Sequence, residues 1–282
     1  MPAIMIMSSA GETGVKRTPS GPAGKTERGK IVMAAKPFQI SAKDLGGLAV
    51  EGACERCFWI RRHRKLPYQM FPGVFTILAD KIKEAAHVYT DAHDGHAPPW
   101  LERYGTEGRY CTQRMSWQSF KYHFEQIPAT LTGMPDDIWE PKANVPQDGT
   151  NPLLTPGPGK TIVDYKVSRA KGADDPFFPV YQVQLNGYAL IANSLPMAAG
   201  YGPIVSGCLV YFDPDHVMPV APDSEGMMFW FAASVVDVPI HTETILPLLK
   251  RARAVFDLPG PPAGAPKCKD CKATDGLMEV LR

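Results

Sequence analysis

Hydrophobic side chains recur at helical spacing in one long stretch of the chain and favour strands in several others. Between residues 75 and 86 the apolar positions fit a helical period: Phe75, Leu78, Ala79, Ile82, Ala85 and Ala86. Helices are also predicted over residues 181–192 and 241–256, and Ser41 is suited to cap a helix that begins at its side. Strands are predicted over residues 130–139, 161–167 and 205–212. This mixture of elements predicts an α/β protein.

The distribution of Gly, Pro and small polar residues sets the expected boundaries. Residues 1–37 are rich in these residues and in Lys, and they lack a sustained hydrophobic period, which predicts a weakly ordered tail. The folded domain is expected over residues 38–275, with residues 276–282 as a short C-terminal tail. A Pro/Gly-rich segment, residues 141–160, predicts a long hairpin loop between two of the strands.

The composition narrows the class of protein. Hydrophobic residues make up 44% of the 282 positions, enough for a substantial core. No apolar run is long enough to span a membrane, no basic segment precedes the short apolar N-terminal run, and six cysteines do not make a secreted disulfide scaffold. A cytoplasmic protein is therefore expected. Lys and Arg total 30 against 29 Asp and Glu, so any nucleic-acid-binding surface must be a local patch.

The predicted strand over residues 161–167 carries the most informative pattern, D-x-K. Because alternate side chains of a strand share a face, Asp164 and Lys166 should point one way and Val163, Tyr165 and Val167 the other. A second predicted strand supplies Asp136, with Asp137 as a rival, and pairing of the two strands would bring two carboxylates together. Such a pair is suited to Mg²⁺ or Mn²⁺, which polarises a phosphodiester and lowers the pKa of its bound water. Lys166 would then orient that water or stabilise charge on the phosphate.

Further along, Gln184 and Tyr188 lie one turn apart in a predicted helix and should share a face. The order G-x-x-D (Gly133 to Asp136), D-x-K, Q-x-x-x-Y resembles the RecB-like exonuclease branch of the PD-(D/E)XK nucleases, in layout over roughly residues 38–275. The resemblance implies a restriction-endonuclease-like core, a mixed central sheet flanked by helices, and Mg²⁺- or Mn²⁺-dependent hydrolysis of DNA, with exonuclease action favoured.

The resemblance also implies roles for single residues. Asp136 and Asp164 would hold the metal with help from the Tyr165 carbonyl, while Gln184 and Tyr188 would orient substrate. The family's first motif is a helical residue, often His, that also contacts metal. In this chain the matching helix offers Asp80, with Glu84 and His87 as further candidates. The third metal ligand is therefore left open among these three.

Two C-x-x-C pairs, Cys54 with Cys57 and Cys268 with Cys271, stand near the two ends of the predicted domain. Each pair presents two thiolates, so together they predict one zinc or iron–sulfur centre that joins the termini. Iron–sulfur members of the RecB-like branch, which include CRISPR-associated exonucleases and helicase–nuclease subunits, imply a [4Fe–4S] cluster, with Zn²⁺ as the alternative. Their usual division is one cysteine against three, whereas this chain has two and two. The single Cys111 and Cys208 are expected to be packing residues.

A basic, aromatic segment surrounds the first cysteine pair. Its members are Arg56, Phe58, Trp59, Arg61, Arg62, Arg64 and Lys65. Arginines beside aromatics suit single-stranded nucleic acid, although a solvated helix face accounts for them equally well. Two other interpretations stay open: a non-catalytic nucleic-acid-binding protein on the same fold, and a zinc-stapled protein of unrelated function.

Overall fold

The computed structural model describes residues 38–64, 73–104, 109–110, 120–140, 159–217 and 229–280. Residues 37–282 form one compact unit, and the predicted tail of residues 1–37 lies outside the described residues, as do Lys65 and Cys111. None of the helices in the described part of the chain is long and apolar enough to cross a membrane.

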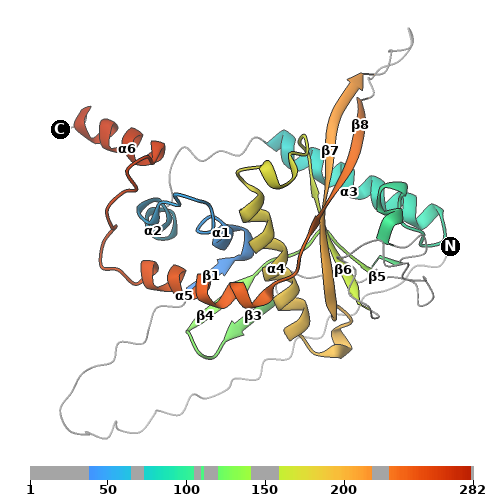
Figure 1. Ribbon diagram of the computed structural model, residues 1–282, viewed down its shortest axis with the longest axis horizontal. Coiled ribbons are helices and arrows are strands. Elements are labelled where there is room, and N and C mark those ends of the chain that lie inside the picture. Colours follow the sequence, from blue (N-terminus) through green and yellow to red (C-terminus); the bar gives the residue numbers. More distant parts are fainter. Residues whose placement is uncertain are drawn as a thin grey trace, which may run out of the picture. The chain divides into compact units, whose positions relative to one another are not determined.

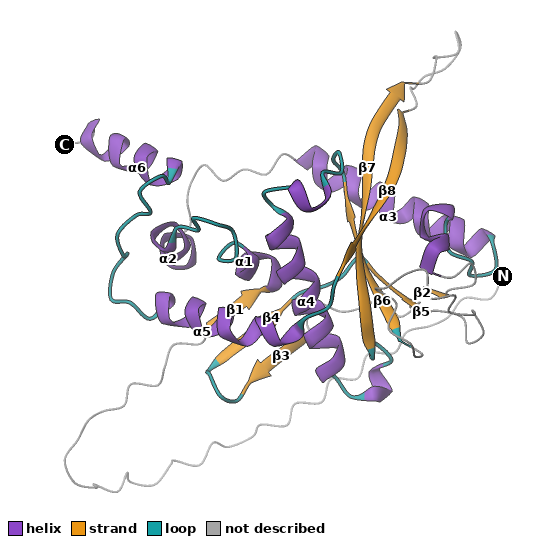
Figure 2. Cartoon of the chain, viewed as in Figure 1, coloured by secondary structure: helices purple, strands orange, loops and turns teal. Residues whose placement is uncertain are grey.

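The described residues fold into a mixture of strands and helices, so the predicted α/β class is confirmed (Figures 1 and 2). The strands are β1 (Phe38–Ser41), β2 (Arg109–Tyr110), β3 (Lys121–Phe124), β4 (Ala129–Thr132), β5 (Asp137–Glu140), β6 (Lys160–Lys166), β7 (Ile204–Val217) and β8 (Phe229–Val238). The α-helices are α1 (Ala42–Gly46), α2 (Glu55–His63), α3 (Gly73–Ala92), α4 (Phe178–Ser194), α5 (Ile245–Phe256) and α6 (Lys269–Val280). Short 3₁₀ helices are η1 (Pro99–Tyr104), η2 (Gly172–Asp174), η3 (Met197–Ala199) and η4 (Thr242–Thr244).

The strands form two mixed sheets rather than a single one. The smaller has the order β1-β4-β3 and the larger β2-β5-β6-β7-β8. In the larger sheet β5 and β6 pair antiparallel, as the long hairpin loop predicted, while β6 and β7 are parallel and connected through α4. A parallel pair needs such a crossover because a tight turn cannot join parallel strands.

The strand predicted over residues 130–139 is wrong as a single element. β4 ends at Thr132 and β5 begins at Asp137, and the two strands belong to different sheets. Between them lies Pro135, which has no N–H to donate to a sheet and is confined to strand edges and bends. The chain therefore leaves one sheet and enters the other at the G-x-x-D segment.

The core lies on both faces of the larger sheet. On one face, Val163 and Tyr165 of β6 and Val210 of β7 pack with Ile82 and Ala86 of α3. On the other, the apolar side chains of β6 and β7 pack with α4, whose middle is buried. Cys208 is fully buried in the first of these clusters, as expected for a packing residue. Residue alternation in β6 thus places Val163 and Tyr165 on the face opposite Asp164 and Lys166, as predicted.

The remaining helices come from the two ends of the compact unit and contact one another: α1 contacts α5, and α2 contacts α5 and α6. Ser41 accepts a hydrogen bond from the Asp44 N–H at 3.0 Å and caps α1, as predicted. The predicted helix over residues 241–256 begins as η4 and continues as α5. α6 runs to Val280, so the domain boundary expected after residue 275 falls within a helix.

Candidate active site and cysteine centre

The antiparallel pairing of β5 and β6 brings the two predicted carboxylates together. Asp137 pairs with Val163, which places Asp136, the residue just before β5, beside the end of β6. The Tyr165 backbone N–H donates a hydrogen bond to Asp136 Oδ2 at 2.8 Å. Asp164 precedes that N–H by one residue, so the two carboxylates lie on neighbouring segments at one end of the sheet.

Asp136 shows the electrostatic effect of this arrangement. Partial burial and the negative charge of Asp164 raise the pKa of its carboxyl from 3.8 to about 6, against the lowering effects of the Tyr165 N–H and of Lys83. Lys83 of α3 lies 3.7 Å from Asp136 Oδ1, and the Asp136 side chain keeps 33% of its surface exposed. Two carboxylates that repel each other at a partly open position suit a divalent cation, which would relieve the repulsion.

Asp164 is buried and held on both sides. The Gln184 side-chain amide donates to Asp164 Oδ1 at 2.9 Å, and Lys166 Nζ lies 2.5 Å from Asp164 Oδ2. The Lys166 ammonium also lies 4.7 Å from the centre of the Tyr181 ring, within range of a cation–π interaction. These contacts fix both the carboxylate and the ammonium of the D-x-K motif.

The helix α4 supplies the other half of the network. Gln184 Nε2 donates to the Tyr188 hydroxyl at 2.8 Å, and Gln184 Oε1 accepts from Lys166 Nζ at 3.4 Å. Burial and the charge of Asp164 raise the pKa of Tyr188 well above 10, so this side chain stays a neutral phenol. Asp164, Lys166, Gln184 and Tyr188 are therefore one connected set of side chains, and Asp136 joins them through the backbone N–H of Tyr165, the residue between Asp164 and Lys166.

The three candidates for a third metal ligand on α3 differ in exposure and in their contacts. Asp80 is exposed, and Glu84 is exposed and paired with Lys81 at 2.6 Å. His87 Nε2 lies 2.7 Å from Asp137 Oδ1, and Asp137 Oδ2 accepts a hydrogen bond from the Tyr165 hydroxyl at 2.7 Å. Asp137, the rival to Asp136, is thus buried on the α3 side of the sheet. The third ligand and the Tyr165 carbonyl stay predictions.

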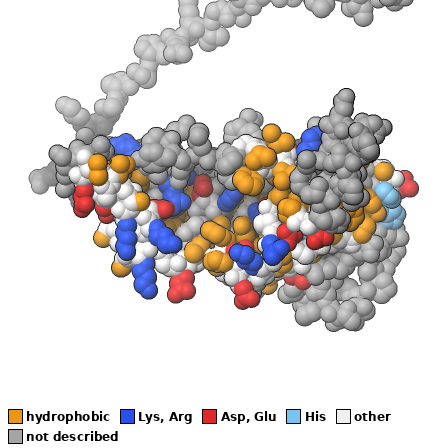
Figure 3. Space-filling model, turned by 90° about the horizontal axis from the view of Figure 1, so that it is seen from above, with side chains coloured by type: hydrophobic (Ala, Val, Ile, Leu, Met, Phe, Trp, Pro, Cys, Tyr) orange, Lys and Arg blue, Asp and Glu red, His pale blue; other side chains and the backbone are white. Residues whose placement is uncertain are grey.

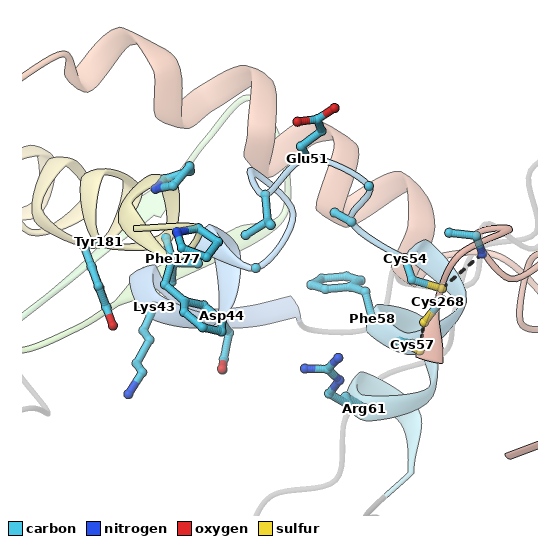
Figure 4. A pocket seen from close by; sticks show the side chains of 18 of the residues that line it. Lys43, Asp44, Glu51, Cys54, Cys57, Phe58, Arg61, Phe177, Tyr181 and Cys268 are labelled. Carbon is cyan, nitrogen blue, oxygen red and sulfur yellow. Dashed lines mark hydrogen bonds between the residues drawn. The ribbon is translucent and has the colours of Figure 1, made fainter. Parts of the chain in front are cut away.

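A broad pocket of about 1420 Å³ opens beside Lys166 and extends to the cysteines. In Figure 4, Tyr181 lies at one end and Cys54, Cys57 and Cys268 at the other, with Lys43, Phe58 and Arg61 between them. Its cationic lining residues are Lys43, Arg61, Arg62, Lys166 and Lys267, and its acidic ones are Asp44, Glu51, Asp174 and Asp175. Figure 3 shows Lys and Arg side chains interspersed with apolar ones on the face it presents.

The four cysteines predicted to form one centre do come together. Cys54 lies just before α2 and Cys268 just before α6, so each C-x-x-C pair occupies the start of a helix. All four Sγ atoms lie within 4.8 Å of one another, close enough to bind one metal ion together. Among the described residues, no other group of three or more His, Cys, Asp or Glu side chains is placed in this way. The predicted metal-binding centre that joins the two ends of the domain is therefore present as a ligand set.

Hydrogen bonds around the centre favour a thiolate at Cys54, whereas burial raises the pKa of the Cys57 thiol and raises that of Cys271 to about 11. The Ala265 N–H donates to Cys54 Sγ at 3.4 Å, and although burial opposes it, this bond and one from the Cys57 N–H help lower the pKa of the Cys54 thiol to about 6. Arg56 makes a two-point ion pair with Asp275, at 3.0 and 2.6 Å, which ties α2 to α6 beside the sulfurs. That pair, and the negative charge of Cys271 and Cys57, raise the pKa of Arg56.

Two residues of the active-site network were not predicted. Tyr181 lies three residues before Gln184 and seven before Tyr188, so the helical period places all three on one face and could have identified it. Lys83 is one turn from His87 on α3, but only the packing of that helix against β6 shows that it reaches Asp136.

Comparisons with known proteins give little further information. No family model matches the chain, and no curated protein matches it. Among solved structures, one described as "Crystal structure of SSO0001" is similar over 79% of each chain, with 14% identity and a TM-score of 0.39. A likeness at that level supports no conclusion on family or function.

Proposed function

We propose that the chain is a metal-dependent nuclease with a restriction-endonuclease-like core, which hydrolyses DNA phosphodiester bonds and acts as an exonuclease. The observation that carries the proposal is the contact network of Asp164, Lys166 and Gln184, with Asp136 bonded to the backbone N–H between Asp164 and Lys166. Its order in the sequence is that of the family the motifs resemble, and its geometry joins two carboxylates and a lysine at one end of the larger sheet.

Asp136 and Asp164 are the residues that would hold Mg²⁺ or Mn²⁺. A bound Mg²⁺ typically keeps several waters and takes one or two protein carboxylates together with substrate phosphate, so two aspartates suffice for a site that is completed by DNA. The cation supplies Lewis-acid activation of the phosphate and of water when it is bound.

The other residues act around that position. Lys166 places a fixed positive charge beside Asp164, where it can orient the attacking water or offset charge that develops on the phosphate. Gln184 donates hydrogen bonds to both Asp164 and the Tyr188 hydroxyl, so it fixes the orientation of the carboxylate. Gln184 and Tyr188 would in turn orient the substrate backbone. Each of these groups is preorganised, which lowers the reorganisation needed during the reaction.

The pocket beside Lys166 supports single-stranded DNA as the substrate form. Phe177 at the start of α4 is 60% exposed and lines this pocket together with Tyr181 and Phe58. Of these rings only that of Phe177 is well exposed, and with the lining cations it offers a stacking surface for an unpaired base and contacts for phosphates. We therefore propose that a single strand occupies this pocket when its phosphodiester lies at Asp136 and Asp164.

Cleavage of fluorescently labelled single- and double-stranded DNA with Mg²⁺, Mn²⁺ or EDTA tests the function. Wild type should cut with metal and not with EDTA, and Lys166→Ala should lose at least about 100-fold in rate, the scale seen when one charge-stabilising donor is removed. Lys166→Met, which keeps the aliphatic stem over Tyr181, checks that lost packing is not the cause. Lys250→Ala, an exposed lysine on α5, is the matched control. A folded wild type that binds DNA but cuts none of these substrates would instead indicate a nucleic-acid-binding protein.

A further inference from the structure

The spacing of the four cysteine sulfurs bears on the kind of metal they hold. Three sulfur–sulfur distances are short: Cys54 to Cys271 at 3.4 Å, Cys57 to Cys268 at 3.5 Å and Cys57 to Cys271 at 3.5 Å. The remaining ones also lie within 4.8 Å. A tetrahedral ion with metal–sulfur bonds of about 2.3 Å has sulfur–sulfur edges of about 3.8 Å, which falls inside this range.

A [4Fe–4S] cluster requires a wider set of ligands. Each of its four thiolates binds a different iron, so every sulfur–sulfur edge exceeds the single-metal edge by one iron–iron separation. A [2Fe–2S] cluster also needs longer distances between the two sulfurs bound to one iron and the two bound to the other. The sulfurs of this chain are spaced as for one ion and would have to move outward along every edge to accept a four-iron cluster.

The surroundings of the sulfurs leave little room for that movement. A side-chain carbon placed on Gly264 would lie 2.9 Å from Cys271 Sγ, so the backbone approaches this sulfur too closely for a residue with a side chain. On the other pair, the Ala265 N–H holds Cys54 Sγ. The ion pair of Arg56 with Asp275 ties together the two helices that would have to separate.

We propose that the four-cysteine centre binds a single zinc ion in tetrahedral geometry, and not the [4Fe–4S] cluster that the family resemblance implied. Two C-x-x-C pairs at helix starts form a closed Cys₄ set, which is typical of structural zinc. Iron as a single ion has the same geometry, but zinc stands above Fe²⁺ in affinity for a given ligand set. The ion joins α2 to α6 and hence the two ends of the domain, and it takes no part in electron transfer.

Metal analysis of the full chain tests this inference without reference to DNA cleavage. The protein is purified without oxygen from cells supplied with both iron and zinc, and zinc, iron and acid-labile sulfide are measured per chain. We expect about one zinc and negligible sulfide, no visible absorption band, and an X-ray absorption spectrum with sulfur neighbours at about 2.3 Å and no metal–metal distance.

Variants relate the measured metal to these cysteines. The double variant Cys268→Ser with Cys271→Ser should lose the zinc, and faster amide hydrogen exchange in α2 and α6 should follow. Cys208→Ala, a cysteine buried in the sheet core, should retain it, and so should Lys166→Ala, whether or not the chain cuts DNA.

Three results would overturn the inference. The first is about four iron and four sulfide per chain with a visible band that dithionite bleaches, and the second is one iron without zinc. The third is a metal-free protein in which Cys54 and Cys271 or Cys57 and Cys268 have formed disulfides.

Discussion

The backbone of Gly133 lies against the Cδ1 and Cε1 atoms of the Tyr188 ring. A side-chain carbon added at Gly133 would come within 2.2 Å of Tyr188 Cε1 and 2.5 Å of Cδ1. The glycine of the G-x-x-D segment is therefore needed for close approach to the tyrosine of the Q-x-x-x-Y segment. The two motifs meet in space. Gln184 donates to Asp164, and Asp136 accepts from the backbone N–H of the residue that follows Asp164.

Gly133→Ala should therefore destabilise the fold and disturb the network. We expect the free energy of unfolding to fall by about 1–3 kcal/mol in chemical denaturation, because neither the β4–β5 connection nor the buried ring can yield without cost. In a Tyr188→Ala background the added methyl group has space, so Gly133→Ala should there cost little. Gly260→Ala, outside the helices and with nothing within 4 Å of the added carbon, is the control. Equal costs in both backgrounds would contradict this contact.

The raised pKa of Asp136 predicts a dependence of stability on pH. The folded carboxyl titrates at about 6 and an ordinary one at 3.8, so between these values the folded state binds the extra proton. The metal-free wild type should therefore lose stability relative to Asp136→Asn as pH rises from about 4 to about 6, and the difference should level off above that. Denaturation of both proteins in EDTA at a series of pH values measures this; parallel profiles would show that Asp136 has an ordinary pKa.

The same titration predicts weaker metal binding in acid. A proton on Asp136 competes with the cation, so the apparent affinity for Mn²⁺ should fall toward tenfold for each pH unit below about 6. Calorimetric titration of wild type with Mn²⁺ from pH 5 to pH 7.5 measures the effect, and Asp136→Asn supplies the comparison. If the stability profiles show the raised pKa and the affinity is still independent of pH over this range, Asp136 is not a ligand.

Much of the site could be predicted from the sequence because it rests on local periodicity. The D-x-K alternation of β6 and the one-turn spacing of Gln184 and Tyr188 fix which side chains share a face before any tertiary contact is known. The cysteine pairs were recognisable for the same reason, since C-x-x-C is itself a local ligand pattern. The distances between the sulfurs are set by the packing of α2 against α6, so the kind of metal could not be read from the pattern.

The incorrect strand prediction and the undecided third metal ligand both depend on tertiary packing. Residues 130–139 are favourable for a strand throughout, and only sheet formation shows that the chain changes sheets between Thr132 and Asp137. The rotation of α3 about its axis decides which of its polar residues reach the carboxylates. That rotation exposes Asp80 and turns Lys83 and His87 toward Asp136 and Asp137, which hydrophobic spacing alone does not specify.

The Tyr165 hydroxyl should contribute to stability from the face opposite Lys166. It donates to buried Asp137, which also contacts His87, so Tyr165→Phe leaves one carboxylate oxygen without this bond. We expect a loss of about 1–3 kcal/mol in the free energy of unfolding. Tyr122→Phe, in a partly buried tyrosine of the smaller sheet, is the control. DNA cleavage well below the melting temperature should be largely retained, and a large loss of cleavage in folded protein would assign Tyr165 a role in the reaction.

Phe177 provides the sharpest test of the proposed path for single-stranded DNA. Its ring is 60% exposed at the edge of the pocket beside Lys166, and one base stacked on such a ring contributes about 1–3 kcal/mol to binding. Phe177→Ala should thus weaken binding of labelled single-stranded DNA at least about fivefold in fluorescence anisotropy, with little change in its dependence on salt. Arg61→Ala should instead reduce that salt dependence, because it removes a cation from the pocket. Met197→Ala, which alters a side chain 92% exposed beyond the other end of α4, is the control. If Phe177→Ala and Met197→Ala bind DNA equally well, the strand does not occupy this pocket, and the active-site network must receive its substrate from another direction.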